Sequence, residues 1–287
     1  MTSRFYKKNK KFLSIIMTSI LIGLTIFFIQ STPTRSENSS ELVPTIFVHG
    51  YKGGPMSFGN MIDRFQDSNW GSKRMVVYVR SNGELSVRGG IPHNMNPMIQ
   101  VLFEDDRASL QSQTLWMQKV MSTLYEKHDI EKANLVGHSM GGLASASFLM
   151  NNQQEGFPTI QKLAVIASPF EGIEKQEYFK NNNGPATDDL RPGSDALEYL
   201  FQHKEDFDQN VQVLAIAGVI NPNDLEKNYW DGLVHTSSVQ SLSEIVPFGS
   251  YQEHLVYGKA ATHSGLHEHP EVDHMLGEFL WNIKSQP

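Results

Sequence analysis

The sequence contains no cysteine among its 287 residues. Structural disulfides and thiolate nucleophiles are therefore excluded, and so is a lipoprotein anchor attached through an acylated cysteine. The chain is nevertheless long enough to bury one full hydrophobic core. Its apolar content of 39% and charged content of 19% are ordinary for a globular protein, which argues against wholesale disorder and against several membrane spans.

Basic charge is scarce outside the N-terminal segment. Residues 1–35 contain six of the 24 basic residues and none of the 31 acidic ones, so residues 36–287 keep 18 basic against 31 acidic side chains, a formal charge of −13. Binding to phosphate backbones requires a basic surface, and this part of the chain has no stripe of Lys and Arg. A nucleic-acid partner is therefore not expected.

A long apolar run, residues 12–29, follows five basic residues at positions 4–11. This order is typical of an export signal, and the run is close to the roughly 20 residues that span a bilayer. We predict that residues 1–35 are a signal peptide or an N-terminal membrane anchor, and that 36–42 are a linker. The protein is then exported, either secreted or anchored on the outer face of the membrane, with membrane contact through the apolar run.

Residues 43–287 are predicted to form one domain of the α/β class. Short apolar runs with little alternation indicate strands that are covered on both faces, and segments of helical spacing lie between them. This alternation predicts a mainly parallel central sheet with helices on both faces. The expected strands are residues 43–50, 75–80, 132–138, 160–168, 211–220 and a last one from Tyr251 through LVYG; the expected helices are 57–66, 109–127, 139–150 and one opened by Pro270.

Two regions interrupt this rhythm. Residues 81–105 are predicted to be an inserted hairpin that turns around Asn82 and Gly83. Residues 170–210 contain NNNGP and RPGSD, and we interpret them as an insertion of helices and loops between two core strands. A substrate cap would lie at such a place.

The strongest chemical motif is NLVGHSMGG, in which Gly137, Ser139 and Gly141 form G-x-S-x-G between an apolar strand and a helix. A serine at such a sharp turn has a strained backbone, and glycines two residues away let the strand and the helix approach each other closely. The hydroxyl is then presented at the carboxyl edge of the sheet. Ser139 is therefore predicted to be a nucleophile that attacks a carbonyl.

GHSMGG, preceded by an early strand that ends in HG, resembles the α/β-hydrolase superfamily and within it the lipases and esterases. The resemblance covers essentially the whole chain from Val43 onward. The segments FVHGYKGG, FEDDRAS and HSGLHEHPEV together resemble uncharacterised cell-surface α/β-hydrolases of low-GC Gram-positive bacteria. This narrower resemblance implies an extracellular location.

The resemblance also implies the rest of the site. Two backbone amides should hold the oxyanion, those of Met140 after the nucleophile and Tyr51 on the loop after the first strand. His49 is expected to hydrogen-bond that loop. The family order of the three reacting groups is serine, acid, histidine.

The acid and the base each have two candidates. Asp231 in the turn D-G-L-V resembles the D-G-x-V turn that carries the acid in related enzymes, and Asp224 is the alternative. His263 in H-S-G-L resembles the H-x-x-L that follows catalytic histidines, and His267 is its alternative. His269, just before the last helix, is expected to cap or pack.

The predicted function is a serine hydrolase that cleaves carboxylic ester bonds in a small or lipid-like acyl substrate, with no cofactor. The histidines and acids of HSGLHEHPEVDH are of the types that bind zinc, but the H-E-x-x-H spacing is absent. The acids of FEDD are of the type that binds calcium, but loop acids are usually solvated. No metal is therefore expected. An amidase or peptidase would use the same three residues. A catalytically silent binding protein is the other alternative.

Overall fold

The computed structural model describes residues 42–90, 95–151, 155–223 and 229–284. In this part of the chain, eight strands form one sheet in the order β3-β2-β4-β1-β5-β6-β7-β8. Neighbouring strands are parallel except β2 and β3, which pair in antiparallel fashion. The strands are β1 (Thr45–Val48), β2 (Gly71–Val79), β3 (Leu85–Gly89), β4 (Asn96–Phe103), β5 (Lys132–His138), β6 (Thr159–Ile166), β7 (Gln212–Val219) and β8 (Tyr251–Tyr257).

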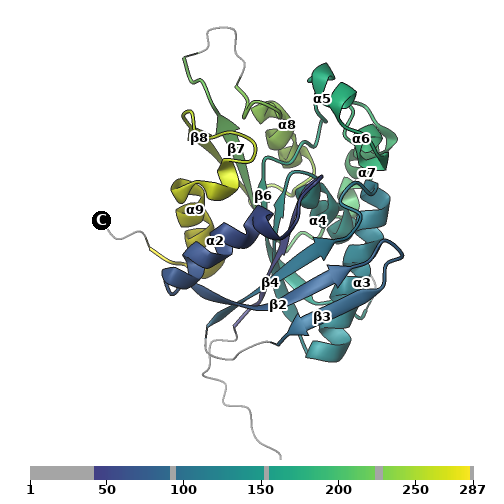
Figure 1. Cartoon of the computed structure of the whole chain (residues 1–287), viewed down its shortest axis with the longest axis vertical. Coiled ribbons are helices and arrows are strands. Elements are labelled where there is room, and N and C mark those ends of the chain that lie inside the picture. The colour runs from purple at the N-terminus through teal and green to yellow at the C-terminus, as the bar shows by residue number, and fades with distance from the viewer. Residues whose placement is uncertain (1–41, 91–94, 152–154, 224–228, 285–287) are drawn as a thin grey trace, which may run out of the picture. The chain divides into compact units, whose positions relative to one another are not determined.

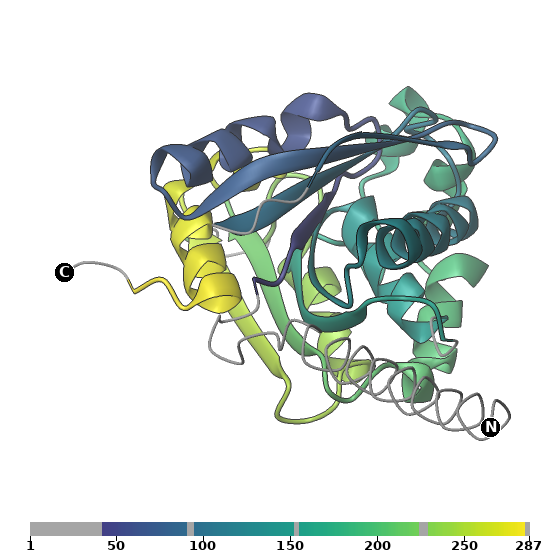
Figure 2. The same cartoon turned by 90° about the horizontal axis from the view of Figure 1, so that it is seen from below.

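Helices cover both faces of the sheet, as expected from the continuous apolar strands. One hydrophobic cluster joins the sheet to α2 and α9, and the other joins it to α3, α4 and the insertion at residues 170–210. Figures 1 and 2 show α2 and α9 together on one side of the sheet and α3 and α4 on the other. The helices are α2 (Pro55–Asp67), α3 (Leu110–His128), α4 (Met140–Met150), α5 (Gln176–Asn181), α6 (Pro185–Asp189), α7 (Asp195–Gln202), α8 (Thr236–Gln240) and α9 (Pro270–Trp281).

The ends of the helices follow local chemistry. Pro55 and Pro270 stand at the first positions of α2 and α9, where the missing N–H costs no hydrogen bond. The Ser109 hydroxyl accepts the amide of Ser112 at the start of α3. His269 Nδ1 accepts the amide of Glu271 at 3.3 Å, so the expected capping by this histidine is confirmed.

The prediction for residues 81–105 is correct for the hairpin and wrong for the residues after the hairpin. β2 and β3 do pair around the turn that contains Asn82 and Gly83. However, β4 is a buried strand that lies between β2 and β1 in the middle of the sheet. Gln100 interrupts its apolar run and is nevertheless buried, at 1% exposed. The buried amide is satisfied, because it donates to Pro55 O and accepts from Lys73 Nζ.

The segment between β6 and β7 contains α5, α6 and α7, as expected for an insertion of helices and loops at residues 170–210. Figure 1 shows these three helices grouped at the right of the view. Phe170, Leu190, Leu197 and Leu200 are fully or almost fully buried and belong to the core cluster that includes α3 and α4. The insertion is therefore packed onto the domain by apolar contacts.

The predicted signal or anchor at residues 1–35, and nearly all of the linker at 36–42, lie outside the described residues. Among the residues that the structure does describe, no helix has both the length and the apolar character needed to cross a membrane.

The close approach of α4 to the sheet predicts a large effect of Gly141→Ala on stability. A Cβ at this position would lie 2.2 Å from Val48 O and 2.5 Å from His49 O, so the backbone would have to move. We expect the free energy of unfolding, measured by urea titration, to fall by about 2 kcal/mol or more. In the control Gly59→Ala, the nearest atom to the new Cβ is 3.8 Å away, and helix propensity should add up to about 1 kcal/mol. Equal stabilities for the two variants would contradict this account of the turn.

Candidate active site

Ser139 lies at the turn between β5 and α4 in a conformation that non-glycine residues rarely adopt. Its φ is +53° and its ψ is −123°, which is a strained combination for a residue with a side chain. Its amide donates to Ile166 O at 2.8 Å, and its carbonyl accepts the amide of Gly142 at 3.0 Å. A Cβ on Gly137 would lie 2.5 Å from Gly142 backbone atoms. The glycines therefore provide the space that the sequence pattern predicts.

His263 and Asp231 meet Ser139 in one hydrogen-bonded series. His263 Nδ1 lies 2.8 Å from Asp231 Oδ2, and His263 Nε2 lies 3.1 Å from Ser139 Oγ. Because an ionised carboxylate can only accept, Nδ1 carries the proton and donates it to Asp231. In the neutral imidazole, Nε2 is then an acceptor for the Ser139 hydroxyl. The structure thus brings the three sequence-predicted residues together, with the imidazole between the carboxylate and the serine hydroxyl.

The turn after β7 holds the Asp231 carboxylate in place. Asp231 Oδ1 accepts the amides of Leu233 at 2.8 Å and Val234 at 2.7 Å, while Oδ2 accepts His263. Gly232 follows with a φ of +91°, which explains the glycine in the D-G-L-V turn. The Asp231 side chain is 1% exposed. These three donors fix the direction in which the buried carboxylate points.

The loop after β1 approaches the same turn. A Cβ on Gly50 would lie 2.8 Å from Ser139 Cβ and 3.4 Å from the Met140 amide nitrogen. Gly50 therefore allows the backbone that precedes Tyr51 to pass beside the serine and the start of α4. In the part of the chain that the structure describes, the hydrogen bonds of turns, loops and caps do not use the Tyr51 or Met140 amide as a donor.

His49 fixes this loop, as expected from the sequence. Its Nε2 accepts the amide of Phe103 at 3.0 Å, and its Nδ1 lies 2.8 Å from Gly50 O. Since a nitrogen that accepts an N–H carries no proton, His49 is neutral with its hydrogen on Nδ1. Burial lowers the pKa of His49, which agrees with the neutral form.

His138 is a site residue that the sequence analysis missed. Its Nε2 donates to the carbonyl of His263 at 2.9 Å, so it supports the backbone of His263. The His138 ring centroid lies 4.8 Å from that of His263 and 5.0 Å from that of His267. Burial, with these two histidines as further causes, lowers the pKa of His138 well below its ordinary value. Its position inside GHSMGG was the available signal.

The two alternative candidates are His267 for the base and Asp224 for the acid. His267 contacts His138, and its Nδ1 lies 3.3 Å from Glu268 Oε1; the hydrogen bonds of the described residues do not join it to Ser139. Asp224 lies outside the described residues. The histidines and acids of the C-terminal region, like all other described residues, form no group of three or more that could hold a metal ion.

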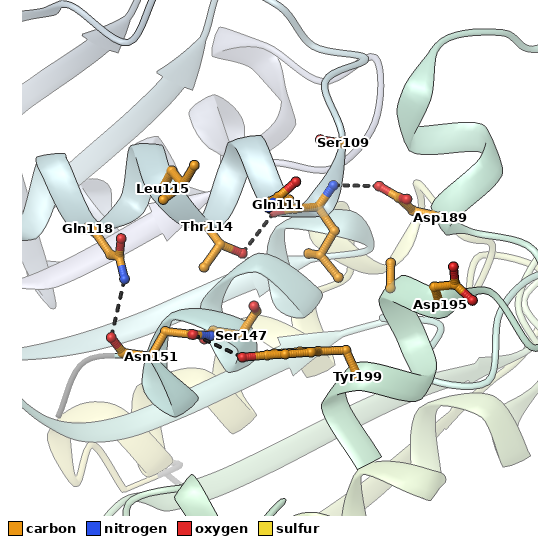
Figure 3. A pocket seen from close by; sticks show the side chains of 12 residues that line it. Ser109, Gln111, Thr114, Leu115, Gln118, Ser147, Asn151, Asp189, Asp195 and Tyr199 are labelled. Carbon is orange, nitrogen blue, oxygen red and sulfur yellow. Dashed lines mark hydrogen bonds between the residues drawn. The ribbon is translucent and has the colours of Figure 1, made fainter. Parts of the chain in front are cut away.

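A groove with a volume of about 500 Å³ lies apart from this arrangement, between α3, α4 and the helices α6 and α7 of the insertion (Figure 3). Neither Ser139 nor its two partners line it. Across the groove, the Tyr199 hydroxyl donates to Asn151 Oδ1 at 3.1 Å, and Gln118 Nε2 donates to Asn151 O at 3.2 Å. These bonds join α7 and α3 to the end of α4.

Acidification is expected to destabilise the fold through His49 and His138. Burial lowers the pKa of both below the ordinary value of 6.5, so near and below this pH the unfolded chain binds protons that the folded chain does not. Their stabilising contribution is complete above pH 6.5 and is lost as the pH falls below it. Between pH 7.5 and 5.5, urea titrations should show a fall in the free energy of unfolding, with each histidine contributing at most about 1.4 kcal/mol.

The variant His138→Gln should show a smaller difference between the two pH values than the wild-type protein. Replacement of the exposed His254 by Gln should leave the difference as it is. A wild-type free energy that is the same at pH 5.5 and 7.5 would contradict the neutral, buried state of these histidines.

Three solved structures resemble the domain. The lin2722 gene product of Listeria innocua is 27% identical with a TM-score of 0.72, over 86% of this chain and 96% of that chain. A proposed cell-surface hydrolase of Lactobacillus plantarum is 20% identical with a TM-score of 0.67, over 86% and 95%. The mature lipase BlEst2 of Bacillus licheniformis is 13% identical with a TM-score of 0.53, over 80% and 90%.

The sequence comparisons agree with the fold. No curated protein sequence matches the chain. The model of a family described as "Alpha/beta hydrolase of unknown function (DUF915)" matches residues 31–283, which is most of the sequence. From this match and the eight-stranded, mainly parallel sheet we conclude that the chain is a hydrolase that belongs to this α/β-hydrolase family.

Proposed function

We propose that the protein is a serine hydrolase that cleaves carboxylic ester bonds through an acyl-enzyme. The observation that carries this proposal is the pair of hydrogen bonds that joins Ser139, His263 and Asp231 at 3.1 and 2.8 Å. A nucleophile, a base within reach of its proton and a carboxylate that orients the base are the three parts that acyl transfer through serine requires.

In the proposed reaction, Ser139 Oγ attacks the ester carbonyl while His263 Nε2 takes the hydroxyl proton. The imidazolium that forms is stabilised by Asp231, whose buried carboxylate remains ionised. Collapse of the tetrahedral intermediate breaks the bond to the alcohol, which leaves with the proton from His263. Water then attacks the acyl-enzyme with His263 again as the base, and this step releases the acid and restores the serine.

The negative oxygen of each tetrahedral intermediate is proposed to lie between the amides of Tyr51 and Met140. Gly50 brings the first of these backbones beside Ser139, and the second amide stands at the start of α4, where the helix dipole favours negative charge. Two fixed donors in a site with little water stabilise this charge more than they stabilise the neutral ester.

The substrate and location are part of the same proposal. The likeness to a lipase fold favours an ester, small or lipid-like, over an amide, and the insertion at 170–210 is proposed as the cap over it. The basic and apolar residues 1–35 are proposed to export the domain, and the resemblance to a proposed cell-surface hydrolase supports an outer location. Residues 43–287 are proposed to be the catalytic domain.

Ser139→Ala should reduce the hydrolysis of p-nitrophenyl esters by about four to six orders of magnitude, because triad residues act as one unit. A fluorophosphonate should label the wild-type protein at Ser139, as mapped by mass spectrometry. Ser147→Ala, on the same helix but outside the hydrogen-bonded series, should keep its activity. Near wild-type turnover by Ser139→Ala would refute the proposal, and labelling without ester turnover would favour an amidase or peptidase.

The base and the acid are tested by paired variants. His263→Gln and Asp231→Asn should each lower kcat by about a thousandfold or more, because the first removes the proton acceptor and the second removes the group that orients it. The alternatives His267→Gln and Asp224→Asn should change kcat by less than about tenfold. A larger loss at either alternative residue would reassign that role.

A further inference from the structure

A short segment of the cap bridges the two loops that flank Ser139. We call residues 175–183, which contain α5, the strap. At its first end, Lys175 Nζ donates to Gly232 O at 3.0 Å and lies 5.3 Å from the ring centroid of Trp230. These two residues stand on either side of Asp231. The strap is therefore fastened at this end to the turn that holds the acid.

The second end of the strap is fastened to the loop that follows β1. The Tyr51 hydroxyl donates to Asn183 O at 2.7 Å and accepts the amide of the same residue at 3.1 Å. Next to it, Lys52 Nζ donates to Asn182 Oδ1. The Tyr51 ring also packs edge-on against Tyr178, with centroids 6.0 Å apart. One tyrosine thus joins the strap through both its ring and its hydroxyl.

The loop after β4 completes this junction. Its Asp106 carbonyl accepts the amide of Lys52 at 2.9 Å, and its Arg107 carbonyl accepts the amide of Ala186 at 3.1 Å. The Arg107 guanidinium donates to Asn183 Oδ1. Gly184, with a φ of +107°, lies so close that a Cβ would be 2.9 Å from Arg107 Cβ. The segments YKGG, DDR and NNNGP, which are far apart in the sequence, therefore meet at one place.

The Tyr51 peptide lies between two fixed points. On its N-terminal side, Gly50 packs against Ser139, and on its C-terminal side, Lys52 is held by Asp106. The Tyr51 side chain is the third support, and it depends on the strap. Because the peptide group is planar, a shift of the Tyr51 Cα turns the adjoining amide. A misplacement of about 1 Å can cost a large factor in rate.

We infer that the Tyr51 hydroxyl is a positioning group, which couples the placement of the strap to the direction of the Tyr51 amide. Catalysis is then efficient only when the strap is in place. The inference rests on the proposed ester hydrolysis at Ser139.

The test is Tyr51→Phe in the full-length protein purified in detergent. This variant keeps the ring and the backbone amide and removes both hydrogen bonds to Asn183. Tyr199→Phe is the matched control, because it removes a tyrosine hydroxyl bond between another cap helix and the core, to Asn151 across the groove in Figure 3. For both variants, kcat and KM are measured with p-nitrophenyl esters of increasing chain length, with the thermal midpoint as a check of folding.

For Tyr51→Phe we expect kcat to fall by about tenfold with a short ester, because one oxyanion donor, worth about a hundredfold or more when it is lost, is misaligned rather than removed. KM should change by less than about threefold, and the pH profile of kcat should keep its shape because His263 and Asp231 are untouched. Hydrogen exchange of residues 176–190 should be faster than in the wild-type protein. Tyr199→Phe should stay within about twofold of wild-type kcat.

Three results would overturn the inference. Unchanged kcat with faster exchange in the strap would show that the amide does not depend on the strap. If Tyr51→Phe had a higher kcat/KM for long esters at unchanged kcat, the strap would only limit the entry of the substrate. Unchanged exchange would show that the hydroxyl does not hold the strap. If Tyr51→Phe fails to fold, Lys52→Met removes the neighbouring bond to Asn182 and should lower kcat in the same direction; a wild-type kcat in this variant would equally count against the coupling.

A failure of the proposed function can be distinguished from a failure of this inference. Absence of both ester turnover and fluorophosphonate labelling in the wild-type protein would refute the proposed ester hydrolysis at Ser139. Even then, the hydrogen-exchange rates of the strap in the wild-type and Tyr51→Phe proteins still show whether the Tyr51 hydroxyl holds the strap in place. Conversely, equal kinetics for Tyr51→Phe and wild type, with Ser139 labelled in both, would leave the reaction standing and refute the coupling alone.

Discussion

The arrangement at the carboxyl edge of the sheet depends on the contact between the loop after β8 and the turn after β7. His263 N donates to Asp231 O at 2.9 Å, and the two side chains bond at 2.8 Å. Gly218 on β7 makes this contact possible, because a Cβ there would lie 2.3 Å from Ala261 O and 3.0 Å from Asp231 Cβ. His138 adds a bond to the carbonyl of His263. The His263 imidazole is therefore held through its backbone as well as by the Asp231 carboxylate.

The parallel sheet explains why these groups meet. The turns after β1, β5 and β7 and the loop after β8 all leave the same edge, so Ser139 and His263 come into contact although they lie 124 positions apart in the sequence. Apolar packing on both faces fixes the strands, and the strain at Ser139 is tolerated because glycine contacts surround it. Two neutral, buried histidines, His49 and His138, then support the loops without adding charge beside the proposed base.

Local chemistry made much of this predictable. The strand, turn and helix around Ser139 carry their own signal in glycine spacing, and the D-G-L-V turn and the position of His263 follow from the family order. β4 was missed as a central strand because polar Gln100 divides its apolar run, although buried partners satisfy that side chain. The contacts of His138 and of the Tyr51 hydroxyl could not be predicted, because no family order or repeating pattern links them to partners that lie 125 and 132 positions away.

The central claim is that the reaction passes through an acyl group on Ser139. The most direct measurement is to quench the enzyme with acid during the turnover of p-nitrophenyl acetate, digest it and map the added acetyl group by mass spectrometry. The account predicts that the acetyl group is found on the peptide that contains Ser139 and that it disappears once the ester is consumed. Steady turnover with no acyl group on Ser139 at any time would contradict it.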